Sequence, residues 1–156
     1  MTLTVSLETD RAVKRKIQET LSALLPEWFA QSDSNLKYAA QAELLPGYVA
    51  RIDGEPRGLL LLKRHSAISA EIYWLGVDPG CHRRGIGRAL AEAAFQAARS
   101  DGVKFLFVCT LHPSASYEPY QRTRHFYEAM DFHYVLEEPF PDETNPLAFY
   151  MKCLID

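Results

Sequence analysis

The stretch Glu71–Leu90 reads EIYWLGVDPGCHRRGIGRAL, and it decides the expected fold because it joins a strand, a loop and a helix. It begins as an apolar run rich in β-branched and aromatic residues, which is typical of a strand. Asp78-Pro79-Gly80 ends that strand, since proline removes a hydrogen-bond donor and glycine frees the backbone. After a short basic loop, Gly85 and Gly87 open a helix with apolar residues at helical spacing. The free N–H groups and positive dipole end of that helix predict an anion site, which glycine lets a phosphate approach closely.

The glycine pattern limits which classes of phosphate ligand this loop is expected to bind. The loop lacks the Lys-Ser/Thr ending of a P-loop, which argues against a magnesium-nucleotide site. A dinucleotide fingerprint needs a third glycine, but Leu90 stands in its place. Two alternatives stay open: a nucleotide-binding module without acyl chemistry, and a helix start whose glycines serve only tight packing.

Two motifs resemble landmarks of the GNAT superfamily, the acyl-CoA-dependent N-acyltransferases. His82–Gly87 (HRRGIG) is similar to the family signature Q/R-x-x-G-x-G/A, with His82 in place of the usual glutamine or arginine. Arg122–Phe132 is similar to the family's FYExxGF helix, with Asp131 in place of the glycine. Aspartate tolerates left-handed geometry better than most residues, so the helix can still end there. The resemblance covers residues from about 48 to 154.

Length and composition predict one globular domain over residues 1–156. The chain is 47% hydrophobic and 24% charged, and its formal net charge of −3 argues against nucleic acid as the main partner. The three cysteines are widely spaced without a C-x-x-C pair, which favours reduced thiols over disulfides or a zinc site. No apolar run reaches membrane-spanning length and no signal peptide precedes the first expected strand, so we expect a cytoplasmic protein.

The order of the elements predicts an α/β (α+β) domain of the GNAT-like type, with a mixed sheet of about six to seven strands and helices on both faces. Asp53-Gly54 is the expected turn of a hairpin, and Gln31–Asn35 the expected polar loop. The crossover through the helix after Gly85 predicts two parallel strands. Strands are expected near 2–7, 48–52, 58–62, 70–77, 103–110, 132–138 and 147–154, and helices near 11–23, 36–42, 85–100 and 120–130.

The resemblance also implies how acetyl-CoA is held. In the family, the strands at 70–77 and 103–110 splay apart to admit the pantetheine arm, and Gly76 is compatible with a β-bulge there. Tyr120 stands where many members have an asparagine that touches this arm. The residues implied are Leu75, Gly76, Val77 and Tyr120 along pantetheine, the backbone N–H groups of Arg83, Arg84, Gly85, Ile86, Gly87 and Arg88 at the pyrophosphate, and Tyr127 at the sulfur of the thioester.

Three groups are the catalytic candidates. By resemblance, the N–H of Leu75 polarises the acetyl carbonyl. Tyr127 is the candidate acid for the departing sulfur, because a phenol stays protonated at neutral pH. Glu71 is the candidate base, and positions 71, 73, 75 and 77 are expected to share one strand face if no bulge intervenes. The alternatives are a core tyrosine, and a rim carboxylate that only binds a cationic substrate.

The expected reaction moves an acetyl group from acetyl-CoA to a primary amine, by direct attack in a ternary complex. Aromatic and acidic residues predict a mouth suited to a cationic amine: Trp28, Phe29, Tyr38, Tyr73, Tyr117, Tyr120, Glu71 and Glu118. Of these, Trp28, Phe29, Glu71, Tyr73 and Tyr117 are the expected substrate contacts. We favour a small-molecule acceptor; the alternatives are a protein N-terminus or lysine, or a non-catalytic acyl-CoA sensor.

No further cofactor is expected. His112, His125 and His133 lack metal-ligand spacing with cysteines or carboxylates, so no metal site is predicted. Cys109 lacks a positioned histidine, which argues against a covalent acyl-cysteine intermediate. The expected partners are acetyl-CoA and the amine acceptor, without nucleic acid or membrane, and a homodimer stays open.

Overall fold

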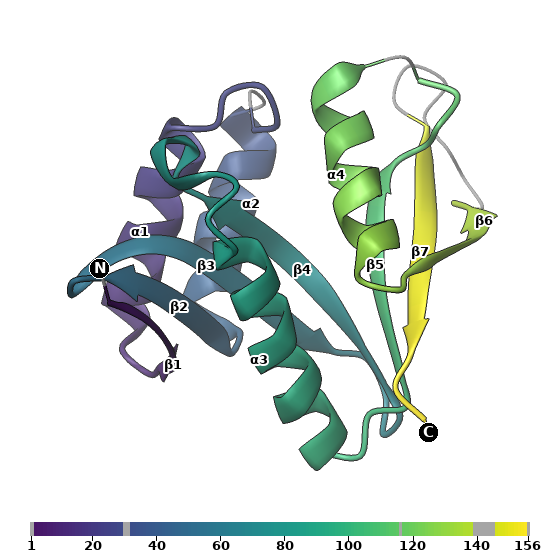
Figure 1. Cartoon of the computed structure of the whole chain (residues 1–156), viewed down its shortest axis with the longest axis horizontal. Helices are drawn as coiled ribbons and strands as arrows, with labels where there is room; N and C mark the ends of the chain where they lie inside the picture. The colour runs from purple at the N-terminus through teal and green to yellow at the C-terminus, as the bar shows by residue number, and fades with distance from the viewer. Residues whose placement is uncertain (1, 30–31, 116, 139–145, 156) are drawn as a thin grey trace. The chain divides into compact units, whose positions relative to one another are not determined.

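The computed structural model describes residues 2–29, 32–115, 117–138 and 146–155 (Figure 1). Its elements follow in the order β1 (Leu3–Glu8), α1 (Arg11–Ala23), α2 (Ser32–Leu44), β2 (Gly47–Ile52), β3 (Glu55–Arg64), β4 (Ser69–Val77), the 3₁₀ turn η1 (Pro79–Cys81), α3 (Ile86–Ser100), β5 (Phe105–Leu111), α4 (Glu118–Ala129), β6 (His133–Glu137) and β7 (Leu147–Cys153). None of the helices within these ranges is long and apolar enough to cross a membrane.

The strands form a seven-stranded mixed sheet in the order β1-β2-β3-β4-β5-β7-β6. β4 and β5 run parallel, with Ser69 opposite Phe105 and Glu71 opposite Phe107, which confirms the expected crossover. The chain divides into two compact units: unit 1 holds residues 1–63 and 72–97, and unit 2 holds residues 64–71 and 98–156. β4 therefore belongs to unit 2 up to Glu71 and to unit 1 beyond it.

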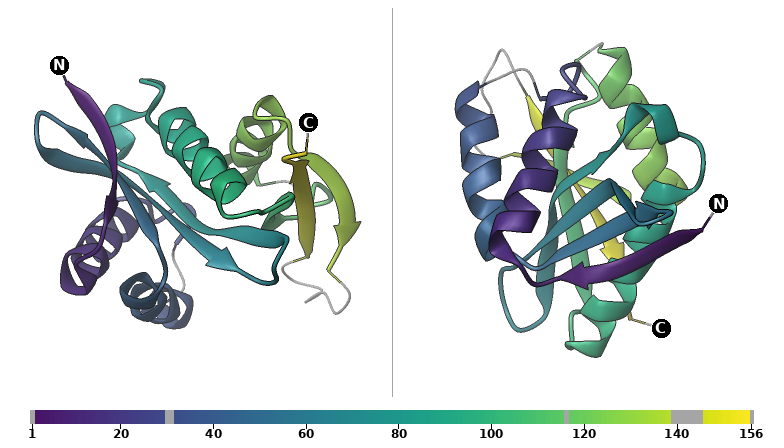
Figure 2. Two further views of the ribbon diagram at one scale, coloured as in Figure 1. Left: turned by 90° about the horizontal axis from the view of Figure 1, so that it is seen from below. Right: turned by 90° about the vertical axis from the view of Figure 1, so that its left-hand side faces the viewer.

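Unit 1 is a three-layer arrangement in which α1 and α2 lie on one face of the sheet and α3 on the other (Figure 2). α1 begins and ends where the sequence predicts. Its start is capped by the Asp10 carboxylate, which accepts a hydrogen bond from the N–H of Val13 at 3.1 Å. On the other face α3 approaches β3 closely, since a Cβ at Gly58 would lie only 2.9 Å from Leu90 and 3.0 Å from Ile86. This close packing fixes the start of α3.

The hairpin between β2 and β3 turns at Asp53 and Gly54, as expected. Their φ angles of 50° and 86° are both left-handed, which this tight turn requires. The leucine run of β3 is buried on both faces, as predicted for a covered strand (Leu59, Leu60, Leu61, Leu62).

The polar loop predicted for Gln31–Asn35 is wrong for its described part, because α2 already begins at Ser32. Serine, aspartate and asparagine are favoured at helix starts, where their oxygens and charge match free N–H groups. Asp33 lies in the first turn, and the Asn35 amide donates to the carbonyl of Phe29 at 2.7 Å. Gln31 lies outside the described residues.

Unit 2 consists of the start of β4, the strands β5, β7 and β6, and helix α4. The buried Arg124 links α4 to β5 by donating to the carbonyl of Leu111 at 2.9 Å. α4 ends at Ala129, and Asp131, just after the C-cap Met130, has a left-handed φ of 70°. The N–H of Phe132 then donates to the carbonyl of Tyr127 at 2.9 Å, which is a Schellman-type helix end. The aspartate thus adopts the geometry that the glycine of the motif would supply.

Candidate active site

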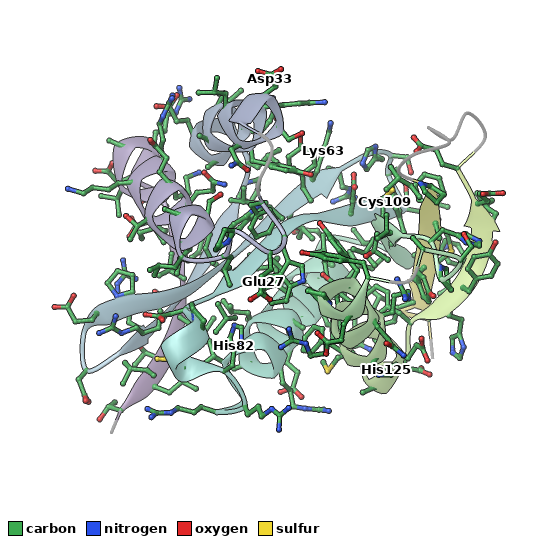
Figure 3. The ribbon with its side chains drawn as sticks, turned by 90° about the horizontal axis from the view of Figure 1, so that it is seen from above. Glu27, Asp33, Lys63, His82, Cys109 and His125 are labelled. Atoms are coloured by element: carbon green, nitrogen blue, oxygen red, sulfur yellow. The ribbon has the colours of Figure 1, made fainter. Side chains whose placement is uncertain are left out.

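The end of β4 and the loop before α3 are held by side chains as well as by the backbone. Asp78 caps η1 by accepting from the N–H of Gly80 at 2.9 Å, and it pairs with Arg57 at 3.1 Å. His82, labelled in Figure 3, donates from Nε2 to the carbonyl of Val77 at 2.9 Å. Its ring also lies edge-on to Trp28, with 6.3 Å between ring centroids. The histidine that departs from the motif therefore fastens the loop to the strand.

The backbone at Gly85 has the properties that a phosphate site requires. Arg83 and Gly85 have φ angles of 65° and 77°, and nothing lies within 4 Å of a Cβ built on Gly85. Residues 82–85 are exposed, whereas Ile86 is buried and begins α3. Within α3 the first hydrogen bond runs from Ala89 to the carbonyl of Gly85, so the preceding N–H groups have no partner within the helix. These residues fit an oxyanion such as the pyrophosphate of coenzyme A.

The β3–β4 hairpin carries one extra residue on β4. At the turn, the N–H of His65 donates to the carbonyl of Ser69 at 3.0 Å, and at the open end the N–H of Asp78 donates to Arg57 at 2.8 Å. Between these two bonds the chain advances nine residues along β4 but only eight along β3. Regular antiparallel pairing advances equally on both strands, so β4 contains a β-bulge.

The bulge overturns the expectation that residues 71, 73, 75 and 77 share one face. Trp74 is buried with Leu59 and Leu61 on the side of α1 and α2, and Tyr73 packs against the same cluster. Two consecutive residues therefore point to one face, and Leu75 turns to the other. Gly76 is required by this packing, because a Cβ there would clash with the Trp74 ring.

Four predicted aromatic residues gather in unit 1, in two groups. Trp28 packs on His82, while Phe29, Tyr38 and Tyr73 join with Trp74. The ring centroids lie 5.1 Å apart for Phe29 and Trp74, 6.3 Å for Phe29 and Tyr38, and 5.5 Å for Tyr38 and Tyr73.

One cation–π position of this cluster is already occupied. The ammonium of Lys63 lies 5.2 Å from the centroid of the Tyr73 ring. The chain itself therefore supplies a cation at the Tyr73 ring.

Three further residues of the predicted mouth, Tyr117, Glu118 and Tyr120, lie in unit 2 at the start of α4. The rings of Tyr117 and Tyr120 are 6.0 Å apart between centroids. Glu118 forms an ion pair with Arg122 at 2.9 Å, one helical turn further on. That ion pair offsets the negative charge that the sequence suggested for this carboxylate.

Glu71 has a partner that sequence reasoning missed. Its Oε1 lies 2.8 Å from Nε2 of His65, and the two side chains are 16% and 36% exposed. The spacing of residues around the hairpin turn could have predicted this pairing. When His65 and Ser69 close an antiparallel hairpin, residue 71 is the diagonal neighbour of residue 65 on the same face.

Tyr127 is buried within unit 2, at 5% exposure. Its ring meets Phe126 and Phe132 in edge-to-face contacts, with centroids 5.2 and 5.3 Å apart. Burial raises the pKa of the Tyr127 phenol far above its ordinary value, because the charged form would lose its solvation. The hydroxyl is therefore protonated at all physiological pH values and can act only as a hydrogen-bond donor or neutral acceptor there.

The other reactive groups of unit 2 show no sign of covalent or metal chemistry. Burial first, then the carboxylates of Glu138 and Glu71, raise the pKa of the Cys109 thiol to about 12. A thiol in that state is a poor nucleophile at neutral pH, because the thiolate is the reactive form. Across the part of the chain that the structure describes, no three His, Cys, Asp or Glu side chains group as metal ligands.

Curated relatives match only part of this chain. A protein named mycothiol acetyltransferase from Beutenbergia cavernae is 47% identical over 51 residues, which are 33% of this chain and 17% of that protein. Another of that name from Actinosynnema mirum is 34% identical over 74 residues, which are 46% of this chain and 25% of that protein. The chain thus matches a quarter or less of the length of these relatives.

Solved structures show the same fold. The ribosomal-protein-S18-alanine N-acetyltransferase from Escherichia coli has a TM-score of 0.76 at 17% identity, over 98% of this chain and 94% of that one. An aminoglycoside 6'-N-acetyltransferase in complex with coenzyme A has a TM-score of 0.71 at 17% identity, over 100% of this chain and 98% of that one. The model of the acetyltransferase (GNAT) family matches residues 14–132. The chain therefore belongs to the acetyltransferase (GNAT) family.

Proposed function

We propose that the protein transfers an acetyl group from acetyl-CoA to a primary amine, by direct attack in a ternary complex. The observation that carries this proposal is the exposed loop before α3. Its left-handed Gly85, open space and free helix N–H groups suit a pyrophosphate held by the backbone. The raised pKa of Cys109 supports direct attack over an acyl-cysteine route.

The amine nitrogen attacks the thioester carbonyl, the C–N bond forms, and the C–S bond breaks with its electron pair on sulfur. Glu71 takes the proton that the amine loses. The N–H of Leu75 polarises the carbonyl oxygen, and the β-bulge supports this role because a bulge leaves backbone groups outside the ladder. Pantetheine lies along Leu75, Gly76 and Val77.

Tyr127 stabilises the leaving thiolate by donating a hydrogen bond. A thiol has an ordinary pKa of about 8.5, far below that of a phenol whose pKa is raised by burial. Complete proton transfer from Tyr127 to sulfur is therefore uphill, and hydrogen bonding to the developing charge is the contribution that this side chain can make.

The acceptor is proposed to be a small-molecule amine. The relatives matched by sequence are named for mycothiol, which supports a small acceptor. Structural neighbours named for a ribosomal-protein alanine and for aminoglycosides share the fold at 17% identity, so they do not decide between protein and small acceptors. Lys63 over Tyr73 disfavours a binding mode in which the acceptor ammonium stacks on that ring.

The test is calorimetry with acetyl-CoA, followed by thiol release against a panel of small amines and amine-bearing peptides. Micromolar binding with amine-dependent thiol release would establish the reaction, and the best acceptor would give the substrate class. Binding without turnover on any amine would favour the second candidate, an acyl-CoA sensor. Equal competition by ATP would contradict the interpretation of the loop.

A further inference from the structure

The Glu71–His65 pair lies entirely in unit 2, and its two side chains differ in solvent exposure. The carboxylate is 16% exposed and the imidazole 36%, so the histidine is the more open partner. The 2.8 Å separation between Oε1 and Nε2 is a hydrogen bond in either charge state of the histidine. A proton taken up by Glu71 can therefore pass to a group that meets solvent.

His65 is held in place by one backbone contact and two contacts of its ring. The N–H of His65 donates to the carbonyl of Ser69 at 3.0 Å, which closes the hairpin turn. Its ring packs on Phe107 of β5 with 5.0 Å between centroids, and Phe107 in turn meets Phe149 of β7 at 5.8 Å. The third contact is the bond to Glu71 itself. A histidine fixed in this way also fixes the carboxylate that it contacts.

Two other titratable groups belong to these surroundings. Cys109 of β5 and Glu138 after β6 interact electrostatically with each other, and Glu71 also acts on Cys109. The thiol stays neutral at physiological pH because its pKa is about 12. On β7, the residues opposite Phe107 and Cys109 are Met151 and Phe149, which do not titrate. His65 is therefore the group of this set whose hydrogen bond to Glu71 can pass a proton on.

We propose that His65 is the positioning residue of Glu71 and carries its proton to solvent. This rests on the proposed function, in which Glu71 takes the proton of the amine. Glu71 becomes a carboxylic acid, the neutral imidazole with its ring proton on Nδ1 accepts the carboxyl proton at Nε2, and the imidazolium then releases its Nδ1 proton to water, which leaves the Nε2–H to donate to the restored carboxylate. When His65 is already protonated, the ion pair stabilises the carboxylate and weakens it as a base. Activity therefore rises as His65 loses its proton.

The pairing is tested without acetyl transfer, by an NMR pH titration of the histidine rings. The His65 signal is assigned by its loss in His65→Gln. Glu71→Gln removes the negative partner, so the His65 midpoint should fall by about half a pH unit or more, since a nearby carboxylate favours imidazolium. The exposed pair of His133 and Asp131, 3.1 Å apart, is the internal control and should not move. An unmoved His65 midpoint would overturn the proposal.

The kinetic role is tested with two His65 variants and one matched control. His65→Gln keeps an N–H donor for Glu71 but does not titrate, and His65→Phe keeps only the ring contact with Phe107. We expect kcat/KM to fall about tenfold in His65→Gln, with loss of the inflection between pH 5 and 8, and further in His65→Phe. His133→Gln removes the exposed pair and should retain the parent profile.

A parent-like profile in His65→Gln would contradict the proposal. Absence of acetyl transfer by the parent on every amine would instead count against the proposed function. In that case the NMR titration still decides whether His65 and Glu71 titrate as a pair, so the two failures are distinguishable.

Discussion

The loop before α3 and the Glu71–Tyr127 residues of unit 2 perform their proposed tasks by different means. The loop relies on backbone: a left-handed Gly85, open space above it and helix N–H groups, with exposed arginines around them. The unit 2 residues rely on side chains that are buried or paired. Binding of acetyl-CoA should therefore be sensitive to backbone geometry. The rate of the chemical step should be sensitive to the loss of single side-chain groups.

The largest expected effect comes from removing one buried oxygen. Tyr127→Phe should lower kcat about a hundredfold while leaving the acetyl-CoA Kd within about twofold, because hydrogen-bond stabilisation of the leaving group acts only during the reaction. Rapid-quench kinetics and calorimetry on the same preparation measure the two quantities. An unchanged kcat would remove Tyr127 from the mechanism and leave it as a core residue of α4.

An effect of similar size at low pH, but dependent on pH, is expected for Glu71→Gln. The loss in kcat/KM should be about a hundredfold at low pH, where the amine is protonated and most needs a base. It should shrink as the pH rises toward the pKa of the amine, because free amine then becomes available. Steady-state pH profiles of parent and variant measure this difference. A constant loss at every pH would assign Glu71 to substrate binding alone.

The fold that carries these residues is only partly predictable from the sequence. Glycine, proline and helical spacing act locally, so the start of α3, the hairpin at Asp53 and the left-handed end of α4 at Asp131 were expected and are confirmed. Helix starts rich in serine, aspartate and asparagine resemble loops in composition, which is why α2 was predicted to begin too late. Local sequence patterns predict the type of each helix or strand well and its first and last residues less well.

The bulge and the Glu71–His65 pair depend on pairing between strands, which no single stretch reveals. An extra residue in β4 reverses every face assignment beyond Tyr73, and nothing in the sequence of that strand requires it except Gly76. The role of the backbone at Leu75 and the splay of β4 from β5 stay predictions. The positions of site residues that depend on strand register could be found only from the structure.

The smallest expected effect concerns Asp131, which stands where the FYExxGF motif has glycine. Asp131→Gly relieves a left-handed φ of 70° but removes exposed contacts to His133 and Lys152. We expect a gain in the free energy of unfolding of about 0.5–1 kcal/mol, since exposed ion pairs contribute little. Thermal unfolding should show a Tm higher by a few degrees with unchanged kcat. A lower Tm would show that the contacts outweigh the backbone strain.

The most direct test of the central claim compares two glycines with similar geometry. Gly85 and Gly54 have φ angles of 77° and 86°, and both have open space around an added Cβ. Gly85→Ala and Gly54→Ala should therefore cost similar stability, about 1 kcal/mol. Calorimetric titration with acetyl-CoA should show an affinity about tenfold weaker or more for Gly85→Ala, and parental affinity for Gly54→Ala. Equal affinities in the two variants would contradict the loop before α3 as the donor site.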